Sequence, residues 1–265
     1  MSSSDNLILD AILIGLQMIY YKFKNNRRAK VFRKMASEHQ LKFWQKPGEY
    51  QGQLDQLKET QTENAYHSSL RRAGSKAKLA ARFFGESPLQ ARLLAFKTNA
   101  WRGDWQTNCN IMEGEWKGHS MTTFDTLFFR VQDPPSEGEY TSVFVRCDAE
   151  MPKMIISPTG LLAGLKRLDE NQFANWGYHK VSFELVDFNK RYRVVSKDEK
   201  LAYGFISQNM MEYLMSHKDD KWHIETAPGG IIISTVYTLN PEKVEKAMDF
   251  LAGFLDHVDK YLLKP

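Results

Sequence analysis

The segment 188–217, FNKRYRVVSKDEKLAYGFISQNMMEYLMSH, constrains the fold of this chain more than any other stretch. It begins with alternating apolar and polar side chains, the period of a half-buried strand. The apolar positions of this alternation are Phe188, Tyr192 and Val194, and the polar positions are Asn189, Arg191 and Arg193. We therefore predict a strand that passes directly into a helix.

The predicted helix starts at a capping box, in which the side chains of Ser196 and Glu199 pair with otherwise unsatisfied backbone N–H groups. Apolar residues then recur at helical spacing, and the polar run 207–209 marks a point where the helix can break. The methionines Met210, Met211 and Met215 lie on this helix. We expect them to pack in the core instead of lining a binding groove.

These residues resemble a family of uncharacterised bacterial proteins that have a short membrane anchor and a cytoplasmic domain of unknown function. The resemblance is carried by FNKRYRVVS (188–196), by the helix start 198–202 and by NMMEYL (209–214), and more weakly by 110–125 and 155–160. Gln208 and Tyr213 stand where the family usually has proline and tryptophan. The resemblance implies a membrane-anchored domain and no particular activity.

A nearly continuous apolar run, LILDAILIGLQMIYY (7–21), is followed by seven basic residues and no acidic residue in 22–34. A helix that spans a bilayer needs about 20 apolar residues, so this run is short, but the basic flank favours an anchor with a cytoplasmic main domain. The alternative is an amphipathic helix that lies on a bilayer or docks on its own domain. The candidate anchor residues are Leu7, Ile12, Ile14, Leu16 and Ile19.

Positive charge is concentrated in the first part of the chain. Residues 1–102 contain 18 Lys and Arg against 8 Asp and Glu, whereas residues 103–265 contain 18 against 24. Basic clusters bind the phosphates of nucleic acid, but they also attract anionic lipid head groups. We favour the lipid bilayer over nucleic acid as the partner, because the charge adjoins an apolar segment and the sequence contains no recognised nucleic-acid module.

The sequence divides into a membrane anchor and basic helix (1–40), a linker and basic helical region (41–103), and an α+β domain (104–265). Helical spacing in 27–40 places Ala29, Phe32, Met35 and Ala36 on one face.

The α+β domain opens with two predicted strands, 107–116 and 119–130, joined by a tight turn at Lys117-Gly118. Further strands are expected at 141–147, 181–185, 222–226 and 231–237. A final helix has Asn240 as its N-cap and Pro241 as its first residue. We predict a curved antiparallel sheet with helices on one face.

No sequence motif specifies a reaction, a cofactor or a metal site. Cys109 and Cys147 have no CxxC spacing, and we expect two buried thiols instead of a disulfide. Asp125, Asp148 and Glu150 lie near strand ends and could act as an acid–base pair, but solvated charges at the sheet edge are the better interpretation.

The polar face of the predicted strand is the candidate binding site. Arg191 and Arg193 would project to one side together with Asn189, where two guanidinium groups can bind a carboxylate or phosphate. The alternative is a solvated strand face.

The sequence leads to two functional hypotheses. The first is a membrane-tethered, non-enzymatic domain, located at the cytoplasmic side of a bacterial inner membrane, that binds a membrane-associated protein or assists complex assembly. The second is a binder or hydrolase of a small acidic ligand that uses the arginine face.

Overall fold

The computed structural model describes residues 24–46, 49–50, 93, 96, 105–130, 136–147, 151–159, 170–235 and 237–259. The candidate anchor residues, the region 51–92 and the segment 160–169 lie outside them. No helix in the described ranges has the length and apolar character needed to cross a bilayer.

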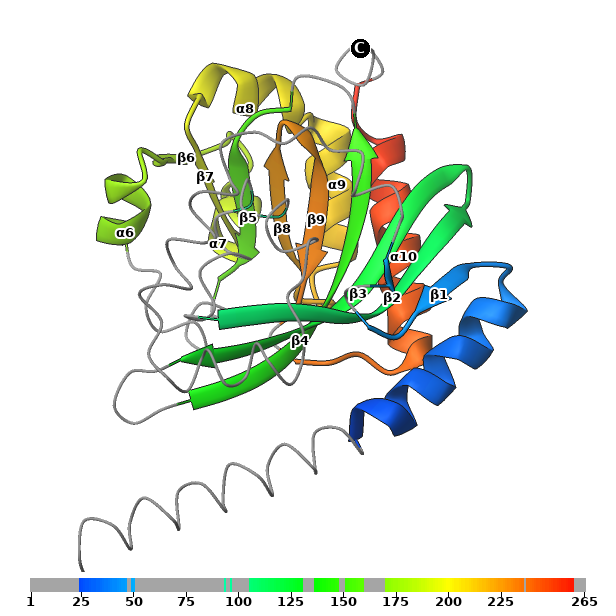
Figure 1. Cartoon of the computed structure of the whole chain (residues 1–265). Coiled ribbons are helices and arrows are strands. Elements are labelled where there is room, and N and C mark those ends of the chain that lie inside the picture. Colours follow the sequence, from blue (N-terminus) through cyan, green and yellow to red (C-terminus); the bar gives the residue numbers. More distant parts are fainter. Residues whose placement is uncertain are drawn as a thin grey trace, which may run out of the picture.

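The fold is α+β and is built on a nine-stranded antiparallel sheet (Figure 1). The strands are β1 (Lys42–Trp44), β2 (Trp105–Trp116), β3 (His119–Arg130), β4 (Ser136–Cys147), β5 (Met154–Pro158), β6 (His179–Val181), β7 (Tyr192–Ser196), β8 (His223–Ala227) and β9 (Gly229–Ser234). Their order in the sheet is β1-β2-β3-β4-β9-β8-β5-β7-β6. The late hairpin β8–β9 is therefore inserted between β4 and β5.

Helices cover one face of the sheet. They are residues 24–38, hereafter the basic helix, together with α7 (Val186–Arg191), α8 (Glu199–Phe205), α9 (Gln208–Ser216) and α10 (Pro241–Asp256). All five contribute to a single hydrophobic core with the strand residues that point the same way, among them Ile156, Val194 and Ile231. The short helix α6 (Glu170–Asn175) packs Phe173 against Ile155 and Val195, which alternate onto the opposite face. The helices therefore lie on one face of the sheet, as predicted, apart from α6, which lies on the opposite face.

Two local predictions are confirmed in detail. Lys117 and Gly118 both have positive φ, 49° and 81°, as a two-residue hairpin turn between β2 and β3 requires. Asn240 caps α10 by accepting a hydrogen bond from the backbone N–H of Lys243 at 2.9 Å, and Pro241 is the first helical residue. The apolar stripe of α10 is buried at Val244, Ala247, Met248, Leu251, Phe254 and Leu255, and Val258 beyond the helix is buried as well.

The prediction of a strand from Phe188 is wrong, because 186–191 forms the helix α7 and the strand starts at Tyr192. The Asn189 side chain pairs with Phe183, accepting from its N–H at 2.9 Å and donating to its carbonyl at 2.5 Å. Phe188 is fully buried and stacks on Tyr192 with ring centroids 5.2 Å apart. These tertiary contacts favour a helical turn over the alternation seen in the sequence.

The predicted capping box is also displaced. The N-cap of α8 is Asp198, whose carboxylate accepts from the N–H of Leu201 at 2.9 Å. Ser196 instead makes a turn with Asp198, accepting from its N–H at 3.1 Å and donating to its carbonyl at 2.8 Å. The break at 207–209 is confirmed, since Ser207 is the N-cap of α9.

Candidate functional site

The basic helix is docked on the sheet by its apolar face. Ala29, Phe32, Met35 and Ala36 are all buried, as their spacing predicts. Phe32, Met35 and Ala36 belong to the same core as α10 and the strands. The basic helix is therefore docked on the chain's own domain, whereas the apolar run 7–21, for which the alternatives were considered, lies outside the described residues.

An ion pair reinforces this docking near the start of the helix. Arg28 donates from Nε to Oδ2 of Asp125 at 2.5 Å and from Nη2 to Oδ1 at 2.8 Å. The same carboxylate accepts from Thr141 Oγ1 at 2.8 Å and from Asn110 Nδ2 at 2.9 Å. Charge-assisted, two-pronged contacts of this kind fix both distance and orientation.

Asp125 is only 2% exposed, so the interpretation of its carboxylate as a solvated edge charge is wrong. No local pattern signals this pairing, because Arg28 is one of many basic residues in its segment and its partner is 97 positions away. The other two acids of that hypothesis, Asp148 and Glu150, lie outside the described residues.

A second contact holds the chain at the other end of the basic helix. Nε2 of His39 lies 2.9 Å from Oε1 of Glu245 on α10, and the His39 ring meets the Trp116 ring edge-on at 4.9 Å. Trp116 in turn donates from Nε1 to Asp249 of α10 at 2.8 Å. The basic helix is therefore attached to the domain at both of its ends.

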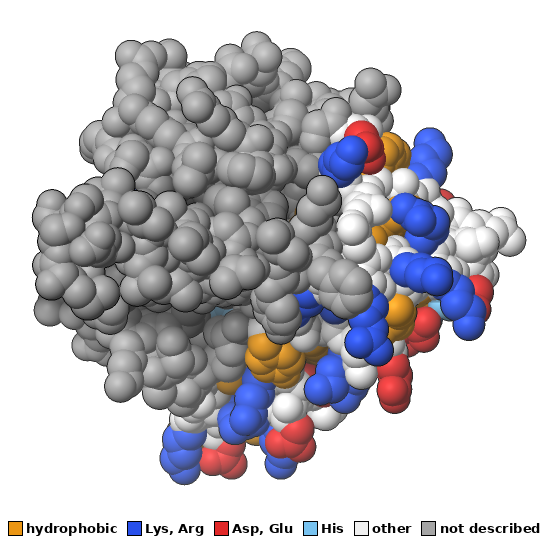
Figure 2. Space-filling view, turned by 60° about the horizontal axis from the view of Figure 1, so that its bottom comes forward, with side chains coloured by type: hydrophobic (Ala, Val, Ile, Leu, Met, Phe, Trp, Pro, Cys, Tyr) orange, Lys and Arg blue, Asp and Glu red, His pale blue; other side chains and the backbone are white. Residues whose placement is uncertain are grey.

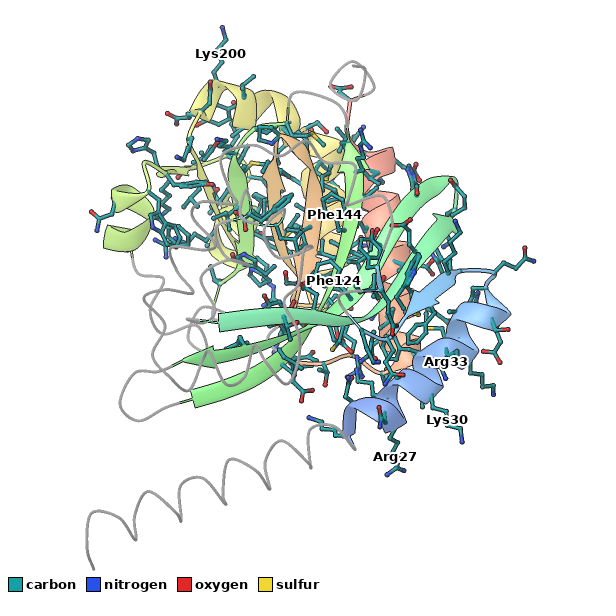
Figure 3. All side chains as sticks on the ribbon, viewed as in Figure 1. Arg27, Lys30, Arg33, Phe124, Phe144 and Lys200 are labelled. Atoms are coloured by element: carbon teal, nitrogen blue, oxygen red, sulfur yellow. The ribbon has the colours of Figure 1, made fainter. Side chains whose placement is uncertain are left out.

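The opposite side of the basic helix faces solvent and is rich in positive charge. The helix carries six basic residues, Lys24, Arg27, Arg28, Lys30, Arg33 and Lys34, and one acidic residue, Glu38. Figure 3 shows Arg27 and Lys30 directed away from the sheet, whereas Arg33 lies over the ring of Phe43 on β1 at 5.4 Å. Figure 2 brings this end of the molecule forward and shows Lys and Arg side chains spread over its described part, with Asp and Glu among them.

We call Arg27, Lys30, Val31 and Lys34 the outer stripe. All four are exposed, and Val31 is 45% exposed. Within the described part of the chain, Lys34 has one ion pair, at 3.6 Å to Glu38, whereas Arg27 and Lys30 have none.

The candidate binding residues 189, 191 and 193 do not form a common face. Asn189 is used in pairing with Phe183, as described above. Arg191, at the end of α7, donates from Nη2 to the carbonyl of Lys218 and lies 3.7 Å from the exposed carboxylate of Asp219. Arg193, on β7, lies over the ring of Phe173 at 5.2 Å. The expectation of two guanidinium groups on one strand face is thus wrong, because Arg191 belongs to a helix.

A row of buried polar side chains crosses the sheet on the face that carries α6. Ser157 Oγ and His223 Nδ1 are 2.7 Å apart, and Ser142 donates to Ser234 at 3.3 Å. A serine hydrogen-bonded to a histidine is the minimal arrangement for a nucleophile and its base. Here both side chains are 1% exposed, so they satisfy each other inside the protein. Only the pairing of β5 with β8 brings them together, and local sequence patterns do not contain that information.

The described residues contain no group of three or more His, Cys, Asp or Glu side chains placed to hold a metal ion. Cys109 and Cys147 are free and buried, as expected. Burial raises the pKa of the Cys109 thiol well above its usual value, and the nearby carboxylates of Asp125 and Glu139 act in the same direction. The thiol therefore stays protonated, and a protonated thiol is a poor nucleophile.

Exposed apolar side chains lie on α7, on α8 and directly before α7. Leu185, Val186 and Tyr203, which we call the α7–α8 patch, are exposed, and Val186 reaches 62%. Tyr203 connects α8 to the segment before α7 by donating to the carbonyl of Ser182 at 3.0 Å. Figure 1 shows α8 at the opposite end of the molecule from the basic helix.

No family model matches the chain, and no curated protein matches it. Among solved structures, the chain is similar to the crystal structure of the mycobacterial trehalose monomycolate transport factor A, TtfA, with a TM-score of 0.47 and 10% sequence identity. The match covers 87% of this chain and 96% of that chain. A likeness of this size does not transfer a function.

Proposed function

We propose that this protein is a membrane-tethered, non-enzymatic domain at the cytoplasmic side of a bacterial inner membrane. In this role it binds a membrane-associated protein or assists the assembly of a membrane complex. The apolar run 7–21 is the tether, and the α+β domain is the part that meets the partner.

The docking of the basic helix is the observation that carries this proposal. The described helix starts at residue 24, three positions after the apolar run ends at 21, and it is attached to the domain through Arg28 and His39. A long flexible linker would let a tethered domain move far from the bilayer. Here a docked helix follows the tether almost at once, which keeps the domain near the bilayer surface.

The α7–α8 patch supports the protein-binding part of the proposal. Exposed apolar side chains that adjoin one another, as Leu185 and Val186 do, can mark an interaction site. Because α8 lies at the far end from the basic helix (Figure 1), Tyr203 on α8 would remain accessible when the basic helix faces the membrane. The second hypothesis, an acidic-ligand site built on Arg191 and Arg193, receives no support from the geometry, since the two side chains contact different elements.

Fractionation of cells that express the full chain tests the tether. We expect the protein in the membrane pellet after washes with high salt and with carbonate, because a spanning segment resists both. Protease added outside spheroplasts should leave the main domain intact. Recovery of the full chain in the soluble fraction at low salt would refute the proposal.

The partner is tested by affinity purification of the detergent-extracted protein. Val186→Asp and Tyr203→Ser should lose the co-purifying protein, whereas Lys180→Gln, a change at an exposed position outside the patch, should retain it. Identical sets of captured proteins from all variants would exclude the α7–α8 patch as the binding surface.

A further inference from the structure

We infer that the outer stripe of the basic helix is a contact surface for anionic lipid head groups and that it sets how the domain lies on the bilayer. This inference rests on the proposed tether, and it adds the lipid class, the residues and the orientation.

The spacing of the outer stripe places its charges in one row. Lys30 and Val31 lie three and four positions after Arg27, and Lys34 lies four and three positions after them, so the four residues follow one face of the helix. With no acidic partner in the described ranges, Arg27 and Lys30 are available to an external anion. Phe32 and Met35 on the inner face of the basic helix are packed in the core, so the helix cannot rotate to expose another face.

The exposed Val31 in the middle of the stripe favours a lipid surface over a purely polar partner. A basic helical face with an apolar side chain can place that side chain among lipid acyl chains while its cations meet head groups. Long Lys and Arg side chains also reach past the helix to the head-group level. The outer stripe has no aromatic side chain on which nucleic-acid bases could stack, which argues against single-stranded nucleic acid.

Because the basic helix is attached to the domain at both of its ends, contact of the outer stripe with a bilayer also fixes the orientation of the domain. Arg28 joins the helix to β3, and His39 joins the following residues to α10. When the outer stripe contacts a charged surface, the sheet and α10 are held in one orientation relative to that surface. The helix α8 then lies on the side of the domain that is away from the membrane (Figure 1).

The strength of the contact follows from its three cations. Each basic residue near an anionic surface contributes roughly a fivefold change in the binding equilibrium, so the three together contribute on the order of a hundredfold. This attraction is screened within a Debye length, which falls from about 10 Å at 0.1 M salt to about 3 Å at 1 M.

The test uses the full chain reconstituted in vesicles and an environment-sensitive dye attached at Val31→Cys. The native thiols Cys109 and Cys147 are buried and should not react. We expect a blue shift of the dye emission in vesicles that contain phosphatidylglycerol, no shift in vesicles of phosphatidylcholine alone, and loss of the shift at about 1 M salt. The same dye at Lys200→Cys, at the other end of the molecule (Figure 3), should report water in every case.

Charge variants complete the test. Arg27→Gln, Lys30→Gln and Lys34→Gln combined should abolish the shift while the chain stays in the vesicle fraction. The matched control, Lys180→Gln, Lys200→Gln and Lys221→Gln, removes three exposed lysines elsewhere and should keep the shift.

Failure of the lipid-contact inference and failure of the tether would give different results in this experiment. Equal emission in both kinds of vesicle, with the protein bound to both, would overturn the inference and leave the tether standing. Absence of the protein from both vesicle fractions would overturn the tether itself and, with it, the inference.

Discussion

Arg28 and Asp125 form a two-pronged ion pair between the basic helix and the third strand of the sheet, with N–O distances of 2.5 and 2.8 Å. Thr141, on the neighbouring strand β4, donates to the same carboxylate and also accepts from Arg28 Nη2 at 3.1 Å. The segment that follows the predicted tether is thereby joined to two strands of the domain. A protein that only needed a flexible anchor would not require this connection.

Arg28→Ala should therefore destabilise the domain strongly. Removing one partner of a buried pair typically costs about 3 to 5 kcal/mol, because it leaves an uncompensated charge. We expect the lower end of this range, since Asn110 and Thr141 still donate to Asp125. The measurement is the free energy of unfolding in urea.

Arg27→Ala is the matched control, because it removes the adjacent, exposed arginine and should change stability by no more than about 0.5 kcal/mol. The double variant Arg28→Ala, Asp125→Ala should lose less than the sum of the two single variants, because no lone charge is left behind. Equal stability of the two arginine variants would mean that the ion pair does not hold the helix.

Leu251→Ala tests the core beneath α10. Leu251 is fully buried, in the core that also contains Phe32 of the basic helix. Truncation of a buried leucine costs about 2 to 5 kcal/mol because it removes apolar contacts and leaves a cavity. Thermal and urea unfolding should both show the loss, whereas exposed Lys243→Ala on the same helix should stay within about 0.5 kcal/mol of wild type. A melting temperature unchanged by Leu251→Ala would contradict the packing of α10.

The hairpin turn and the helix start that depend on residues adjacent in the chain could be predicted from the sequence. Gly118 identifies its hairpin because glycine accepts the positive φ that a two-residue turn requires. Asn240 and Pro241 identify the start of α10 in the same way, through a side-chain cap and a preset φ.

Contacts beyond immediate sequence neighbours decided the rest. The alternation at 188–194 fits a strand, yet Asn189 pairs with Phe183 and closes a helical turn instead. In the sequence alone, Asp125 fits a solvated carboxylate at the sheet edge, but in the structure it forms an ion pair with Arg28. The insertion of β8–β9 between β4 and β5 depends on long-range pairing, which no local pattern specifies. The outer stripe could be predicted as basic, but its orientation required the docked structure.

The position of the cap leads to a prediction about Asp198. Asp198→Ala should cost about 1 kcal/mol, the usual effect of losing an N-cap side chain, because the N–H of Leu201 loses its acceptor. Asp198→Asn keeps an acceptor and should restore most of the loss. If Asp198→Ala has no effect on urea unfolding, the helix start lies elsewhere.

Tyr192 leads to a prediction for alkaline pH. Burial raises the pKa of Tyr192 from 10.0 to about 12; Arg191 opposes this shift, and Asp220 and Asp219 add to it. The hydroxyl also donates to the carbonyl of Leu214 at 2.7 Å. Because the folded pKa is higher than the unfolded one, this stabilisation is complete below pH 10 and is lost as pH rises to about 12.

The free energy of unfolding should accordingly fall between pH 10 and pH 12. Tyr192→Phe should be less stable than wild type below pH 10, where it lacks the hydrogen bond, but its stability should fall less steeply above pH 10. Part of the fall should remain, since burial also raises the pKa of Tyr178 and of Tyr213. Parallel curves for the two proteins would exclude Tyr192 as a contributor.

The last prediction concerns Arg191 and Arg193, for which the sequence suggested one shared binding site. Arg191→Ala should lose a charged hydrogen bond to the carbonyl of Lys218, and Arg193→Ala should lose the contact with the Phe173 ring. These two contacts lie on different elements and involve different partners. Their effects on the free energy of unfolding should therefore add within about 0.5 kcal/mol in the double variant. A coupling energy well above that, measured in a urea double-mutant cycle, would show that the two arginines do not act independently in the folded protein.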